Sequence, residues 1–196
     1  MVLSDEGIRE ALRTGQIVIR PAPQPEQYQT SAIDVVLGDS FKVWDLETLA
    51  NTPGFKPELD LSEQQFANTA RKFSKDAVRQ PDGCVILPPY RAVPQVMLCQ
   101  TKEYLELNPE SRIAARVEGR SSLARLGVMV HLTAPTIHAG FSGNITLELM
   151  NHGPFYLKLV PYKTTIGQFI FERLETEPAM TISTGFQGQD TPIGKS

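Results

Sequence analysis

The chain has 196 residues, of which 41% are hydrophobic and 21% charged, a composition that excludes a disordered chain. Its formal net charge of −3 provides no global positive field, so we expect no DNA or RNA polymer as partner, whereas a small phosphorylated ligand needs only a few local cations. The N-terminus lacks a signal-peptide pattern and no apolar run reaches the ~20 residues of a spanning helix, which predicts a cytoplasmic protein without membrane association.

The length suffices for one sizeable core and no composition shift divides the chain, so we predict a single domain over residues 1–196. The opening SDEGIREALRTGQ predicts a short helix with Ser4 as its N-cap and Gly15 at its end. IVIR predicts a strand, and three alternating prolines follow it. AIDVVLGDSFKVW then predicts a pair of strands broken at Gly38-Asp39-Ser40.

Residues 51–83 are polar, and we treat them as a variable insertion over the core. Within them only SEQQFANTARKFSKDAV is suited to a helix, with Phe66, Ala70 and Phe73 at helical spacing. From Cys84 onward, short strands alternate with turns, which predicts a mainly β protein built as a barrel or sandwich. The predicted strands are CVILPP, VPQVMLCQT, RIAARVEG, GVMVHLTA, GNITLELMN, YLKLVP and TIGQFIFERLE.

Cys84 and Cys99 are the only cysteines, and the apolar run around Cys99 predicts a buried free thiol. Zinc-dependent nucleobase deaminases need a C-x-x-C pair and an H-x-E segment to generate hydroxide from bound water. This sequence contains neither, so we expect no zinc.

One six-residue block is dense in polar groups. Its two guanidinium and two hydroxyl groups can grip phosphate oxygens, but the residue types fit equally a loop whose arginines are solvated and whose serines cap a short helix. The block consists of Arg120, Ser121, Ser122, Leu123, Ala124 and Arg125.

Glu148 lies in a predicted strand whose alternation places Ile145, Leu147 and Leu149 on one face and Thr146 and Glu148 on the other. If the second face is wet, Glu148 is an ordinary surface acid. If that face lines a closed pocket, desolvation raises the carboxyl pKa and makes the group a competent proton shuttle. The residue types alone leave both alternatives open.

Together, these segments resemble a known family. GRSSLARLG, a TA pair and GFSGNITLE resemble the signature of dCTP deaminases, a branch of the trimeric dUTPase superfamily. AIDVVLGDSF resembles the family's strand near the start of the fold, and FQGQ resembles its nucleotide-covering tail, here residues 184–196. The resemblance implies a dUTPase-like distorted, jelly-roll-like β-barrel with a short N-terminal helix and a helical insertion.

The resemblance also implies roles. Glu148 would take a proton from a water that attacks C4 of cytosine, while Ser121, Arg125 and the main chain near Ala134 would hold that water and the base. Arg120, Ser122, Leu123 and Ala124 would bind phosphate, Thr146 and Leu147 would pair with the base through main-chain groups, and Gln189 would contact the base or the phosphates. The active sites would form between subunits of a homotrimer, with Mg2+ bound through the nucleotide phosphates rather than in a protein cage.

The chain departs from the family pattern at two positions. Most members carry aspartate where His138 stands, and that aspartate meets the sugar hydroxyl and, in dUTPases, positions the hydrolytic water. His138 can bind a sugar hydroxyl or simply pack in its turn, and neutral imidazole gives no negative charge to orient a water attacking phosphorus. Gly185 stands where a lysine usually precedes the tail's aromatic residue, and the tail composition also fits a frayed terminus.

Three functions compete. Deamination of dCTP to dUTP, within pyrimidine deoxynucleotide metabolism, is favoured by the arginine–serine block and Glu148 together. Hydrolysis of dUTP to dUMP, alone or after deamination, is disfavoured by His138. A nucleotide sensor without turnover would keep the pocket, but it would not need a proton-transferring carboxylate such as Glu148.

Three further residues are interpreted from their positions in the chain. We interpret His131 as a strand residue and His152 as a solvated turn residue, and Phe141 as a candidate sugar contact.

Overall fold

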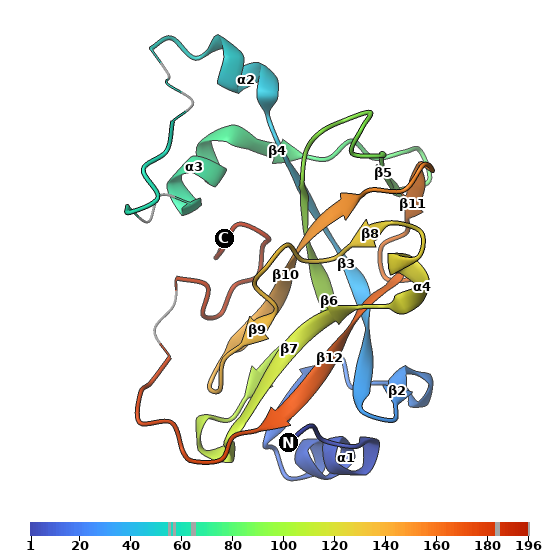
Figure 1. Cartoon of the computed structure of the whole chain (residues 1–196), viewed down its shortest axis with the longest axis vertical. Coiled ribbons are helices and arrows are strands. Elements are labelled where there is room, and N and C mark those ends of the chain that lie inside the picture. The colour runs from blue at the N-terminus through green and yellow to red at the C-terminus, as the bar shows by residue number, and fades with distance from the viewer. Residues whose placement is uncertain (55, 57, 64–65, 183–184, 196) are drawn as a thin grey trace.

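The computed structural model describes residues 1–54, 56, 58–63, 66–182 and 185–195. Its helices are few and short, and strands supply the framework (Figure 1). The helices are α1 (Asp5–Arg13), α2 (Leu46–Asn51), α3 (Phe66–Phe73) and α4 (Ser121–Ala124), with 3-10 turns at Pro25–Gln27 and Pro109–Ser111. None of the helices in the described ranges is long and apolar enough to cross a membrane.

Most of the strands in the described ranges join one curled sheet, in the order β8-β10-β6-β3-β12-β7-β9. Off this path, β1 pairs with β6, and β2 and β4 pair with β3, while β11 and β5 form a separate ladder. The strands are β1 (Ile17–Arg20), β2 (Tyr28–Gln29), β3 (Ala32–Trp44), β4 (Ser74–Asp76), β5 (Val85–Leu87), β6 (Met97–Leu107), β7 (Ile113–Gly119), β8 (Val128–Met129), β9 (Thr136–Ile137), β10 (Ser142–Asn151), β11 (Leu157–Leu159) and β12 (Thr165–Arg173).

The sheet curls because its long strands change partners along their length. The first half of β3 pairs with β12 and the second half with β6 and β4. β10 pairs with β6 along its length, but the register shifts between Asn144 and Thr146. The apolar faces enclose one core cluster, in which Leu147, Phe169 and Phe171 have 0% exposure. A mainly β fold is therefore confirmed, and the single domain over residues 1–196 stays a prediction.

The predicted N-terminal helix is confirmed as α1. The Ser4 hydroxyl accepts a hydrogen bond from the Gly7 N–H at 3.3 Å, which satisfies one of the free donors at the helix start. Ile8 and Ala11 are buried against the sheet, and Gly15 follows the C-cap with a φ of +71°. Both cysteines are free and buried, as expected for Cys99.

The predicted break in the strand at Gly38-Asp39-Ser40 is wrong, because β3 runs through it as one strand. A Cβ atom at Gly38 would lie 3.0 Å from the carbonyl oxygens of Gln100 and Thr101, so only glycine permits this approach to β6. The backbone is irregular rather than turned, and Arg79 stabilises it by donating to the Asp39 carboxylate at 2.7 Å and the Asp39 carbonyl at 2.8 Å.

The predicted helix over 62–78 is too long. Of the residues described there, only Phe66–Phe73 are helical, and Ser74–Asp76 instead pair with β3 as β4; Gln64 and Gln65 lie outside the described residues. The helix ends because the Asp45 N–H donates to the Phe73 carbonyl at 2.7 Å and turns the chain into the sheet. The strand predicted over 127–134 is likewise shorter, since only Val128 and Met129 form β8.

Candidate active site

The alternation predicted for β10 is present in the structure and positions the site. Leu147 and Leu149 have 0% exposure and point into the core. Thr146 and Glu148 lie on the opposite face of the same strand and line a cavity of about 420 Å³. Ile145, on the same face as Leu147 and Leu149, also lines the cavity, so the cavity extends to the edge of the core.

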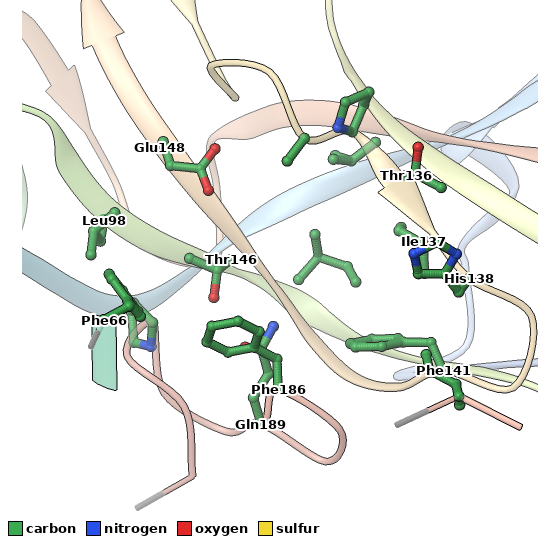
Figure 2. Close-up of a pocket in the computed structure, with 16 residues that line it drawn as sticks. Phe66, Leu98, Thr136, Ile137, His138, Phe141, Thr146, Glu148, Phe186 and Gln189 are labelled. Carbon is green, nitrogen blue, oxygen red and sulfur yellow. The ribbon is translucent and has the colours of Figure 1, made fainter. Parts of the chain in front are cut away.

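The cavity collects side chains from distant parts of the chain (Figure 2). β10 forms one wall, with Glu148 and Thr146 facing inward, and the segment containing β9 forms the facing wall with Thr136 and His138. Ala134 also lines the cavity. α3 and the C-terminal tail close a third side. The full lining is Phe66, Leu98, Val117, Ala134, Pro135, Thr136, Ile137, His138, Phe141, Ile145, Thr146, Glu148, Ile182, Phe186, Gln189 and Pro192.

Glu148 is half-buried, and its carboxyl group lies at the cavity wall beside Leu132. Its Oε2 accepts a hydrogen bond from the Leu132 N–H at 3.3 Å. Burial raises the pKa of Glu148 above its ordinary value of 4.5, and the Leu132 hydrogen bond and the nearby His131 only partly offset that rise. A carboxyl group with a raised pKa is suited to accept and return a proton near neutral pH.

The Thr146 hydroxyl is buried, and no described residue forms a hydrogen bond with it. The side chain of Gln100 lies directly opposite Thr146 in the β6–β10 ladder, and its Oε1 is also buried without a partner in the described part of the chain. Buried polar atoms are normally hydrogen-bonded, and an unpaired one costs about 1–3 kcal/mol. The Thr146 hydroxyl, on a residue that lines the cavity, therefore has hydrogen-bonding capacity that the described part of the chain does not use.

His138 and Phe141 lie close together at the wall opposite β10 (Figure 2). His138 opens a turn in which its carbonyl accepts a hydrogen bond from the Phe141 N–H at 3.1 Å. Both side chains line the cavity, and Phe141 is 8% exposed. These placements agree with a sugar-contacting role for either residue, and those roles stay predictions.

Within its described residues, 185–195, the C-terminal tail is hydrogen-bonded to β10 through residues 187–189. The Gly188 N–H donates to the Ser142 carbonyl at 2.6 Å, and the Asn144 N–H donates to the Gln189 carbonyl at 3.1 Å. The Gln189 side chain is 6% exposed and donates to the Asn144 carbonyl at 2.6 Å. Gln189 thus both lines the cavity and anchors the tail.

The arginine–serine block does not reach this cavity within one chain. Arg120 is the N-cap of α4 and forms an ion pair with the buried Asp34 at 3.4 Å, while Ser121 and Arg125 do not line the cavity. In Figure 1, α4 lies on the opposite side of the view from β9. The alternative in which the serines cap the helix is wrong, because the N-cap position belongs to Arg120. The remaining block residues, Ser122, Leu123 and Ala124, belong to α4 and are likewise absent from the cavity lining.

The site also includes residues that the sequence did not single out. The Leu147 side chain lies in the core, and the base-pairing role of its main chain stays a prediction. Phe66 lines the cavity from the insertion, although its helical spacing with Ala70 and Phe73 indicated only a packed helix face. Ile182 and Pro192 carried no signal that could have assigned them to this pocket.

The chain is similar in sequence to a known protein family. Over residues 2–174 the chain matches the family model described as dCTP deaminase-like. The chain belongs to the dCTP deaminase-like family. The family match includes β10 with Glu148, the whole of residues 51–83 and α4, and ends before the tail.

Two relatives of this dCTP deaminase-like chain are similar over most of its length. A dCTP deaminase from Aeromonas hydrophila subsp. hydrophila is 38% identical over 176 residues, which cover 89% of this chain and 84% of that protein. A dUMP-forming dCTP deaminase from Methanobrevibacter smithii is 35% identical over 175 residues, which cover 89% and 81%.

Among solved structures, the 2'-deoxycytidine 5'-triphosphate deaminase from Agrobacterium tumefaciens is similar, with a TM-score of 0.58 at 20% sequence identity. The similarity covers 87% of this chain but 47% of that chain, so this dCTP deaminase-like chain spans about half of the solved one. At this identity the likeness concerns the fold, and it confirms the dUTPase-like fold that the sequence resemblance implied.

No group of three or more His, Cys, Asp or Glu side chains that could hold a metal ion occurs in the described ranges. The polar groups that line the cavity are one carboxylate, two hydroxyls, one imidazole and one amide.

Proposed function

We propose that this protein hydrolytically deaminates dCTP to dUTP and ammonia, in pyrimidine deoxynucleotide metabolism. The observation that carries the proposal is the half-buried Glu148 beside the unpaired Thr146 hydroxyl, in the cavity of a dCTP deaminase-like chain. In the reaction, water adds to C4 of the cytosine ring and the C4–N bond breaks. The ring keeps the water's oxygen, and the amine leaves as ammonia.

Glu148 supplies the proton transfers. Water is a poor nucleophile at neutral pH, so the carboxylate accepts a proton from it as the C–O bond forms. The carboxyl group gives that proton to N3. It then takes the remaining proton from the hydroxyl group on C4 and passes it to the amine, so that the C4–N bond breaks and ammonia leaves as the C4 carbonyl forms. The raised pKa supports this double role, because it makes the carboxylate a stronger base than an ordinary glutamate.

We infer that the catalytic set is completed by a second copy of the chain in a homotrimer. Ser121 and Arg125 lie away from the cavity of their own chain, and apolar side chains near them are exposed. Leu126, next to Arg125 in sequence, is 43% exposed, and Met129 is 37% exposed. An exposed apolar patch beside α4 is suited to a subunit contact that would bring the arginine–serine block to a neighbour's Glu148.

We propose Mg2+ as a cofactor that binds through the triphosphate. Mg2+ keeps several waters and usually binds a nucleotide site through phosphates plus at most one or two carboxylates, so a cavity with one carboxylate fits this mode. The ion would shield phosphate charge, and the chain's own residues would bind the base and sugar. We expect the protein to work in the cytoplasm, where its soluble nucleotide substrate is used.

The test is ammonia release from dCTP with Mg2+ by the unsubstituted protein and by Glu148→Gln. The amide cannot accept a proton, so we expect kcat to fall at least about 100-fold while dCTP still binds by calorimetry. Glu106→Gln is the matched control, because Glu106 lies on β6 in a surface ion pair with Arg20. Undiminished turnover by Glu148→Gln would remove Glu148 from the reaction.

A second candidate is a dUMP-forming deaminase, which the M. smithii relative favours by its name. Pyrophosphate released together with ammonia from dCTP would support it. His138 in place of the family's aspartate disfavours this activity, so His138→Asp should increase pyrophosphate release if the position controls it. Nucleotide binding without either product would instead support a sensor.

A further inference from the structure

Helix α3 has one apolar stripe, and only part of that stripe is buried in the fold. Phe66, Ala70 and Phe73 recur at i, i+4 and i+7, and so lie on one face of the helix. Ala70 has 0% exposure and Phe73 3%, whereas Phe66 is 39% exposed. The inner two residues anchor the helix, and Phe66 extends from the anchored helix toward the cavity.

Phe66 contacts the tail at the cavity. Its ring and that of Phe186 have centroids 5.9 Å apart with an interplanar angle of 61°, an edge-to-face arrangement. Phe186 is 41% exposed, and both rings line the cavity that contains Glu148. Figure 2 shows them side by side, across the cavity from His138.

The same two rings also line a second cavity of about 820 Å³, between the insertion and the tail. That cavity is further lined by Trp44 of β3 and by Gly185 and Lys195 of the tail. The aromatic pair therefore lies between the Glu148 cavity and a second cavity of larger volume.

We propose that Phe66 is a substrate-pocket residue, which together with Phe186 forms an aromatic closure that holds the tail over the bound nucleotide. The inference assigns a role to the 51–83 insertion, and it rests on the proposed nucleotide function. Phe66 approaches from a helix fixed to the sheet, whereas Phe186 belongs to a tail held by hydrogen bonds to Ser142 and Asn144. The fixed ring stabilises the docked position of the other ring.

The size of the effect follows from the contact. Edge-to-face aromatic pairs contribute a stabilisation equivalent to about 2- to 12-fold in an equilibrium constant. Phe66→Ala should therefore increase KM for dCTP by about that factor, with a smaller change in kcat, because the ring closes the pocket and takes no proton. Phe66→Tyr keeps the ring and should restore KM.

The experiment has two readouts. In the first, chymotrypsin cleavage after Phe186 is followed by mass spectrometry in the nucleotide-free protein. Phe66→Ala should accelerate formation of that fragment, and Phe66→Tyr should not. Leu46→Ala is the control, since Leu46 is a 54% exposed residue of α2 that lines neither cavity.

In the second readout, KM and kcat for dCTP are measured for Phe66→Ala, Phe186→Ala and the double variant. Closure by the pair predicts that the double variant is impaired less than the product of the single effects. Unchanged cleavage and unchanged KM in Phe66→Ala, or strictly multiplicative effects, would overturn the inference. Failure of the unsubstituted protein to turn over dCTP would instead refute the proposed function, and the cleavage rates would still report the tail contact.

Discussion

The surroundings of Glu148 contain groups that destabilise its ionised form and groups that stabilise it. Partial burial opposes ionisation, while the Leu132 N–H and the neighbouring His131 favour it, and burial dominates. A surface strand glutamate would experience none of these influences. The balance suits a group that must exist in both protonation states during one turnover.

The first prediction concerns pH. A general base must be deprotonated in the free enzyme, so the raised pKa of Glu148 moves the acidic limb of kcat/KM to a pH above 4.5. The limb should appear in a rate–pH profile, and carboxyl ¹³C shifts of the nucleotide-free protein should show one glutamate titrating at the same pH. That signal should disappear in Glu148→Gln. A limb at or below the ordinary glutamate value would contradict the assignment.

A second prediction separates a ligand-binding hydroxyl from a structural one. Thr146→Val removes an unpaired buried hydroxyl at nearly constant shape, so Tm should stay equal or rise while dCTP affinity falls about tenfold. Thr101→Val is the contrast, because the fully buried Thr101 hydroxyl donates to the Glu103 carbonyl and accepts from the Ile145 N–H. That variant should lose about 1–3 kcal/mol of stability by thermal denaturation. A destabilised Thr146→Val would contradict a ligand-binding role.

At the scale of the element, β10 and the tail form one unit. Gly143 has a φ of +149°, and a Cβ atom there would lie 3.1 Å from the Gln189 backbone nitrogen and 3.1 Å from the Phe141 ring. Glycine at this position lets the tail approach the strand closely. The docked tail thus depends on a residue of the strand that carries Glu148.

Gly143→Ala should therefore displace the tail. We expect faster chymotrypsin cleavage after Phe186 and a KM for dCTP raised about tenfold, with part of the effect due to backbone strain in β10. Gly185→Ala is the matched control, because a Cβ atom at Gly185 would meet nothing within 4 Å. Equal cleavage rates in the two variants would show that Gly143 does not control docking.

The elements that the sequence predicted correctly depend on local physics. α1 follows from its cap and apolar spacing, and β10 follows from strict alternation. The errors arise where a contact with a residue far away in the sequence determines the course or the end of an element. β3 passes Gly38 unbroken because β6 lies against it, and α3 ends where Asp45 captures the Phe73 carbonyl.

The residues of the candidate site likewise fall into those that the sequence predicted and those that depend on distant contacts. Glu148, Thr146, Ala134 and His138 lie in one stretch of sequence and meet in one cavity. Gln189 could be placed there only through the family resemblance, and Phe66 belongs to a segment that the sequence separates from the motif by about 70 residues. The arginine–serine block is close to Glu148 in sequence, but the curl of the sheet carries it away within the chain.

For the whole molecule, the separation of Arg125 from the cavity makes a complementation experiment possible. Glu148→Gln and Arg125→Ala should each be inactive alone. If each site takes Glu148 from one subunit and Arg125 from the next, denaturing and refolding the two variants together at equal ratio should restore about a quarter of the sites. Ammonia release from dCTP by the mixture measures this recovery, and a mixture as inactive as its components would refute a shared site.

The shift in pairing between Asn144 and Thr146 has a consequence for how sequence change acts on this molecule. Because a strand's side chains alternate, a one-residue insertion or deletion at that point would rotate everything after it by half a turn. Leu147 would then face the ligand and the carboxylate would face the apolar interior. A length change at this point should therefore prevent folding. A length change within residues 58–63 should leave the chain folded and increase only the rate at which the nucleotide dissociates.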